Sequence, residues 1–105
     1  MRRDYNDTMK FNIDNKTNDN PINVMRELGY HLIKKEADQF SLVKSIGSNF
    51  YPRFHIYLEE KDNLLFNLHL DQREPRYKGT TAHNAEYNGE IIEKEKERIV
   101  KGFDN

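Results

Sequence analysis

Two short runs of alternating apolar and polar residues, lying between residues 52 and 71, constrain the fold of this chain more than any other feature. Alternation with a period of two residues is typical of a strand that buries one face. The apolar positions are Phe54, Ile56, Leu58, Phe66, Leu68 and Leu70. Between the runs, Lys61-Asp62-Asn63 predicts a three-residue hairpin turn with Asn63 in the left-handed conformation.

The length of this turn sets the register of the predicted hairpin. A three-residue loop pairs Glu60 with Leu64, and counting back from this pair brings all the apolar residues onto one face. A slip of one residue would mix apolar and polar side chains on both faces, so the register is well specified. On the polar face the predicted pairs are His55 with His69, Arg53 with Asp71, and Tyr57 with Asn67.

Helices are predicted on either side of this hairpin. Asn20 and Pro21 are typical of an N-cap and a first helical residue, and Gly29 is a typical stop, so a short helix is expected over Pro21–Leu28. A second, charged helix is expected over Glu90–Lys101, ending at Gly102. Its EKEKER run is interpreted as a solvated face.

The remaining segments allow alternatives. Residues 30–46 fit a helix, but a loop through Asp38-Gln39 and then a strand over Phe40–Ile46 is favoured, since the hairpin needs a neighbour. Residues 1–19 are rich in Asn and Asp and are expected to form a flexible arm, the alternative being an edge strand over Lys10–Ile13. The predicted fold is α+β, a single domain over residues 20–105 with an antiparallel sheet of about three strands.

Composition narrows the classes of protein to consider. The chain has 105 residues, of which 35% are hydrophobic and 33% charged, with a formal net charge of -1. This charge argues against bulk electrostatic steering toward nucleic acid. The chain has no cysteine, no apolar stretch long enough to cross a bilayer and no recognisable secretory signal, so a cytoplasmic protein without membrane contact is expected.

The polar face of the hairpin gathers side chains that carry chemistry. His55, His69 and Asp71 form the ligand set of a two-histidine, one-carboxylate site, which suits zinc, manganese or iron, with manganese or zinc preferred. Cross-strand histidine pairs also occur by chance on solvated faces, which is the simpler interpretation. Residues 72–88 form a long connection, a kind of segment that is often functional, and it adds the third histidine of this region. Basic residues that could hold phosphate surround the site: Arg53, Arg73, Arg76 and Lys78.

The order of these residues resembles that of a known family. His55, then His69-Leu70-Asp71-Gln72-Arg73, then His83-Asn84-Ala85-Glu86-Tyr87 is similar to the 3′-phosphoesterase domain of bacterial ligase D. The chain also resembles small bacterial proteins of unknown function with a YPRFH…NLHLDQ…HxxEY pattern. The first resemblance implies that His55, His69 and Asp71 bind a divalent metal. It also implies that Arg73 and Tyr87 hold phosphate, while His83 acts as proton donor.

Three functional interpretations follow. The first is a metal-dependent phosphoesterase acting on phosphorylated substrates, including nucleic-acid 3′ ends. The second is a binding module without catalysis, in which tyrosines such as Tyr57 stack on a nucleotide or peptide. The third is an interaction protein that forms a homodimer through the strand at Phe40–Ile46.

Overall fold

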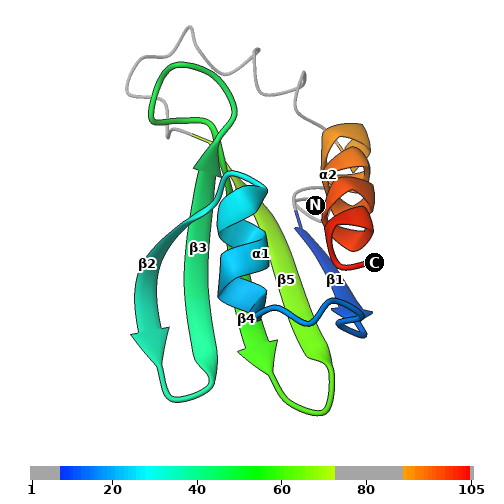
Figure 1. The fold of residues 1–105 in the computed structure, drawn as a ribbon. Coiled ribbons are helices and arrows are strands. Elements are labelled where there is room, and N and C mark those ends of the chain that lie inside the picture. Colours follow the sequence, from blue (N-terminus) through cyan, green and yellow to red (C-terminus); the bar gives the residue numbers. More distant parts are fainter. Residues whose placement is uncertain (1–7, 73–88, 105) are drawn as a thin grey trace, which may run out of the picture.

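The computed structural model describes residues 8–72 and 89–104, which form a five-stranded sheet and two helices (Figure 1). The sheet is antiparallel throughout, with strand order β1-β5-β4-β3-β2. The elements are β1 (Thr8–Ile13), α1 (Pro21–Glu27), β2 (His31–Glu36), β3 (Gln39–Ser45), β4 (Arg53–Glu60), β5 (Leu64–Asp71) and α2 (Gly89–Gly102).

The sheet is larger than the sequence predicted. The fold is α+β with a C-terminal helix, but the expectation of about three strands is wrong, because β1 and β2 add a strand at each edge. β1 lies in the segment expected to be a flexible arm and pairs with β5 from Thr8–His69 to Ile13–Leu64. The alternative of an edge strand is therefore the correct one for this segment. Residues 1–7 lie outside the described part.

β2 and β3 form a second hairpin. Residues 37 and 38 connect them, and Ala37 adopts a positive φ of 50°. The predicted strand over Phe40–Ile46 is found within one residue, whereas a helix over residues 30–46 is not. β3 pairs with β2 on one side and with β4 on the other. It therefore offers no free edge, and the expected self-pairing through this strand is wrong.

The central hairpin has the predicted register. Glu60 pairs with Leu64, Ile56 with Leu68 and His55 with His69. The predicted conformation of the turn is wrong, however. Among the described residues other than glycine, Ala37 is the one with a positive φ, so Asn63 is not left-handed.

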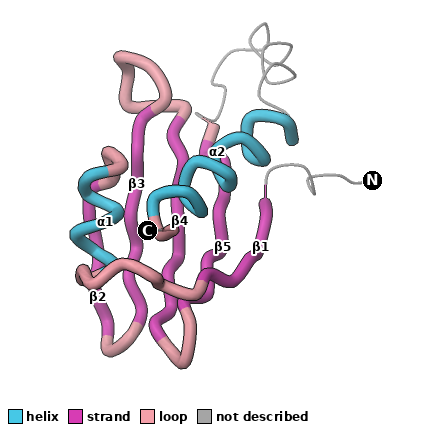
Figure 2. Tube along the Cα trace, turned by 45° about the vertical axis from the view of Figure 1, so that its right-hand side comes forward, coloured by secondary structure: helices cyan, strands magenta, loops and turns pink. Residues whose placement is uncertain are grey.

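Both helices lie on the same side of the sheet (Figures 1 and 2). Their apolar residues form one core with the inward residues of the strands, and Met25, Ile56 and Ile99 are fully buried there. α1 begins as predicted, because the side chain of Asn20 accepts a hydrogen bond from the backbone of Ile22. It is followed by Gly29 at a φ of 102°. None of the helices in the described residues is long and apolar enough to cross a membrane.

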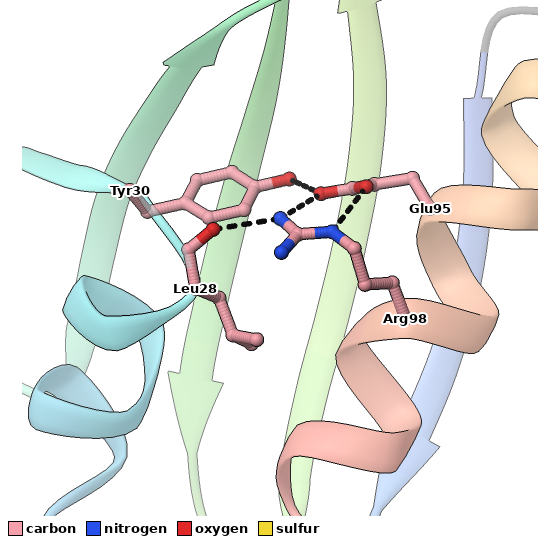
Figure 3. A network of polar contacts seen from close by, with 4 residues as sticks. All are labelled: Leu28, Tyr30, Glu95 and Arg98. Atoms are coloured by element: carbon pink, nitrogen blue, oxygen red, sulfur yellow. Dashed lines mark hydrogen bonds and ion pairs between the residues drawn. The ribbon is translucent and has the colours of Figure 1, made fainter.

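A buried polar network fixes α2 against the rest of the domain (Figure 3). Tyr30 donates a hydrogen bond to Glu95 Oε2 over 2.6 Å, and Arg98 Nε donates to Glu95 Oε1 over 2.9 Å. Arg98 also donates to the carbonyl oxygen of Leu28 over 2.7 Å. The EKEKER run was expected to be solvated, but Glu95 within it is only 6% exposed. Burial and the neighbouring Glu95 carboxylate raise the pKa of Tyr30 far above its usual value.

Candidate functional site on the outer face of the sheet

The face of the sheet opposite the helices, called the outer face here, is covered by no helix of the described residues (Figure 2). Residues that pair directly across neighbouring strands point to the same side of a sheet, so the register assigns its members. The outer face carries Thr8, Lys10 and Asn12 of β1, His31, Lys34 and Glu36 of β2, Gln39, Ser41, Val43 and Ser45 of β3, Arg53, His55, Tyr57 and Glu59 of β4, and Leu65, Asn67, His69 and Asp71 of β5.

Two histidines lie side by side at the middle of this face. His55 pairs with His69, and the centroids of their rings are 6.3 Å apart. The ring of Tyr57 packs against both, with its centroid 4.5 Å from that of His55 and 5.5 Å from that of His69. Thr8 Oγ1 lies 3.2 Å from His69 Nδ1, which ties the second imidazole to β1. The three rings therefore form one cluster.

Asp71 contacts the Nδ1 atom of His55 and thereby orients the imidazole ring. Its Oδ2 atom lies 3.1 Å from His55 Nδ1 and 3.5 Å from Arg53 Nε. The Arg53 guanidinium lies over two aromatic rings, 5.0 Å from the centroid of Phe50 and 4.8 Å from that of Tyr51. The side chains of His55 and Arg53 are each only 14% exposed, so both are held in place by their surroundings.

Three buried polar atoms of this face have no hydrogen-bond partner among the described residues. They are Arg53 Nε, His55 Nε2 and Asn67 Oδ1. The 3.5 Å contact between Arg53 Nε and Asp71 is an ion pair whose geometry falls outside that of a hydrogen bond, which explains why this nitrogen is unpaired. Buried polar groups are normally paired with protein, water or a ligand, so these unpaired atoms make this part of the outer face the candidate site.

The protonation of His69 bears on what the cluster can do. Burial and the nearby His55 lower the pKa of His69 below its usual value of 6.5, more than Asp71 raises it. His69 is therefore a neutral imidazole near pH 7, and a neutral ring nitrogen can accept a proton or bind a metal.

The predicted metal ligands do not converge on one point. His55, His69 and Asp71 share the outer face as expected, but the described residues contain no group of three histidine, cysteine or acidic side chains that could hold a metal ion. His55 presents Nδ1 to Asp71, so these two groups face each other rather than a common centre. As arranged, the residues fit a histidine–carboxylate pair beside a second histidine, and not a three-ligand site.

Of the other predicted site residues, the structure describes only Arg53. Arg53 lies at the site, next to Asp71. His83, Arg73 and Tyr87 lie outside the described residues, as do Arg76 and Lys78.

Sequence reasoning missed the contributions of Thr8, Phe50 and Asn67. Thr8 lies in the segment expected to be flexible, and the loop that carries Phe50 has no periodic pattern. Asn67 was placed opposite Tyr57 but was given no role. Its position on the polar face was the available signal.

Comparisons with known proteins identify no relative. No protein-family model, curated protein or solved structure matches this chain. Functional inference therefore depends on the site itself.

Proposed function

We propose that the outer face is the active site of a phosphoesterase that acts on phosphorylated substrates, including nucleic-acid 3′ ends. The observation that carries this proposal is the pairing of His55, oriented through Nδ1 by Asp71, with the neutral imidazole of His69. A histidine held by a carboxylate beside a second histidine is suited to proton transfer.

Hydrolysis of a phosphate ester needs two proton transfers. When the N–H group at His55 Nδ1 donates a hydrogen bond to Asp71, the buried and unpaired Nε2 carries a free lone pair, which would accept the proton of an attacking water molecule. The oxygen that leaves phosphorus must gain a proton. The protonated fraction of His69, which is small near pH 7 because the pKa of this residue is lowered, lies close enough to supply one. His83, which the family resemblance implies as proton donor, is the alternative source.

Arg53 would bind the phosphate group. Its guanidinium is held by two aromatic rings and by Asp71, so little side-chain freedom is lost when it donates to a phosphoryl oxygen. The resemblance to the ligase D phosphoesterase domain implies that Arg73 and Tyr87 assist. The same resemblance favours nucleic-acid ends over other phosphate esters.

The divalent metal stays a prediction. Two imidazoles and a carboxylate are suitable donors for manganese or zinc, but the contact between His55 and Asp71 would have to open before all three could bind one ion. Elemental analysis of purified protein, with His31→Ala as a control outside the cluster, tests this prediction, and about one ion per chain would support it. Binding should weaken at acid pH because protonated imidazoles do not bind metals. Equal metal content in His69→Ala and in the wild type would contradict this ligand set.

The activity is tested by phosphate release from a 3′-phosphorylated oligonucleotide. We expect release by the wild type in at least one of three conditions, namely with manganese, with zinc or with a chelator. Asp71→Asn should reduce kcat by at least about tenfold, because His55 then loses the carboxylate that fixes its tautomer. No release from the wild type in all three conditions would refute the proposal.

A second candidate is a binding face without catalysis. Tyr57 favours it, since this tyrosine is 48% exposed at the centre of the outer face and is available for stacking. In that case a nucleotide or peptide ligand would bind without being converted, and binding would survive removal of metal.

We place the protein in the cytoplasm, since a chain without cysteine needs no oxidising compartment.

A further inference from the structure

A groove on the outer face lies directly beside the histidine cluster, toward the β4–β5 turn. Its volume is about 470 Å³, and its outward lining includes Lys10, Gln39, Tyr57, Glu59, Leu65 and Asn67. Tyr57 belongs both to this groove and to the cluster with His55 and His69. A ligand that occupies the histidine cluster can therefore extend into the groove.

The groove contains a hydrogen-bond acceptor that lacks a donor. Asn67 lines this groove, and its Oδ1 atom is buried and has no hydrogen-bond partner among the described residues. A buried amide oxygen is satisfied only by an N–H or O–H group. The missing partner is thus a donor on the ligand.

The groove also contains a flat apolar surface. The ring of Tyr57 is held by the two imidazoles and is still 48% exposed. A tyrosine fixed in this way stacks well on a planar ring, because little side-chain freedom remains to be lost.

Charge argues against a second phosphate in the groove. The lining contains one cation, Lys10, and one anion, Glu59, so the lining itself carries no net charge. A neutral, planar group that carries an amino donor fits such a lining better than an anion does.

The spacing of the two sites matches a single nucleoside unit. The Tyr57–Asn67 pair and the His55–His69 pair are successive outward pairs of one ladder, and such pairs are roughly 6.8 Å apart along the strands. The sugar of a nucleotide separates its base from its phosphate by a comparable span.

We propose that the groove binds the nucleobase of the nucleotide whose phosphate lies at His55 and His69. The base would stack on Tyr57, and its exocyclic amino group would donate a hydrogen bond to Asn67 Oδ1. This assignment rests on the proposed phosphoesterase function and narrows its substrates to nucleotides and nucleic-acid ends. It favours bases with an exocyclic amine.

The test uses adenosine and purine riboside, which lacks the 6-amino group, as phosphate-free probes of the full-length protein. Calorimetry should show that adenosine binds about tenfold more tightly than purine riboside, since the analogue leaves Asn67 unpaired. In Asn67→Leu the two affinities should become equal, whereas the matched variant Asn23→Leu on α1 should keep the difference. Tyr57→Ala should weaken adenosine binding about tenfold, and Tyr57→Phe should restore most of it.

The outcomes separate the two proposals. Equal binding of adenosine and purine riboside by the wild type, or a difference that persists in Asn67→Leu, would overturn the groove assignment even where phosphate is released from an oligonucleotide. Selective adenosine binding without phosphate release from any ester would instead support the base site and contradict the phosphoesterase.

Discussion

His55 lies directly opposite His69 on β4 and β5, and the centroids of the two imidazole rings are 6.3 Å apart on the face that no described helix covers. At this separation the charge of one ring affects the other, and His55 contributes to the lowered pKa of His69. The Asp71 carboxylate acts in the opposite direction and raises the pKa of His69, but less than burial and His55 lower it.

The first prediction concerns the titration of His69 in protein freed of divalent ions. Its NMR midpoint should lie below the usual pKa of 6.5. His55→Ala should raise this pKa, since a neighbouring positive charge is removed, while Asp71→Asn should lower it further because a favourable carboxylate is lost. A midpoint at 6.5 or above, or one that neither variant moves, would contradict the described environment of His69.

The second prediction concerns stability as a function of pH. Because the pKa of His69 is lower in the folded state, the unfolded chain binds more protons between that pKa and about 6.5. The free energy of unfolding should therefore rise with pH through this window and gain nothing more from His69 above it. Urea titrations at a series of pH values should show a smaller rise for His69→Gln than for the wild type. Parallel curves would argue against the shift.

The third prediction concerns the network around Glu95. Glu95→Ala should destabilise the fold by about 3 kcal/mol, because Tyr30 and Arg98 both lose their partner. Tyr30→Phe should cost only about 1 kcal/mol, since Arg98 still binds the carboxylate. Glu93→Ala, on the exposed side of α2, is the matched control and should change stability by less than about 0.5 kcal/mol. Similar losses for the Glu95 and Glu93 variants in urea unfolding would refute this role.

The fourth prediction concerns the two turns. Ala37 has a positive φ of 50°, a conformation that strains a residue with a Cβ atom, so Ala37→Gly should stabilise the protein by about 0.5 kcal/mol. Asn63 has no positive φ, so Asn63→Gly should leave stability unchanged or reduce it. Thermal unfolding of the two variants is the measurement. A stabilising Asn63→Gly together with a destabilising Ala37→Gly would contradict the backbone conformations described for both turns.

Much of the fold follows from local sequence patterns. The β4–β5 register depends on the alternation of apolar residues such as Ile56 and Leu68, and a slip of one residue would have scrambled both faces. The start of α1 depends on the Asn20 cap and the end of α2 on Gly102. These signals lie within a few residues of the structure that they predict.

The parts that were missed depend on distant contacts. β1 lies in a stretch rich in Asn and Asp and forms a strand because β5 offers it a free edge. β2 and β3 are connected through Ala37 without a glycine or an Asn-Gly signal, so the second hairpin had no turn signature. Glu95 looked solvent-exposed in a charged run, and only the position of Tyr30, 65 residues away, explains its burial.

In the candidate site, too, some features follow from the local sequence pattern and others depend on distant contacts. Its register placed His55, His69, Asp71 and Arg53 on one face correctly. The contact of His55 Nδ1 with Asp71 depends on side-chain rotation and could not be predicted from residue spacing. The groove beside Asn67 needs β1 and β3 as walls, and β1 was not expected to be ordered.

The most direct test of the account is a comparison of His69→Ala with His31→Ala in phosphate release from a 3′-phosphorylated oligonucleotide. His31 lies on the edge strand β2, outside the cluster, and provides a histidine control of the same size. We expect His69→Ala to lose at least about a hundredfold in kcat, while His31→Ala retains wild-type activity. Equal activity in the two variants, or no activity in the wild type, would contradict the claim that the paired histidines of the outer face perform the chemistry.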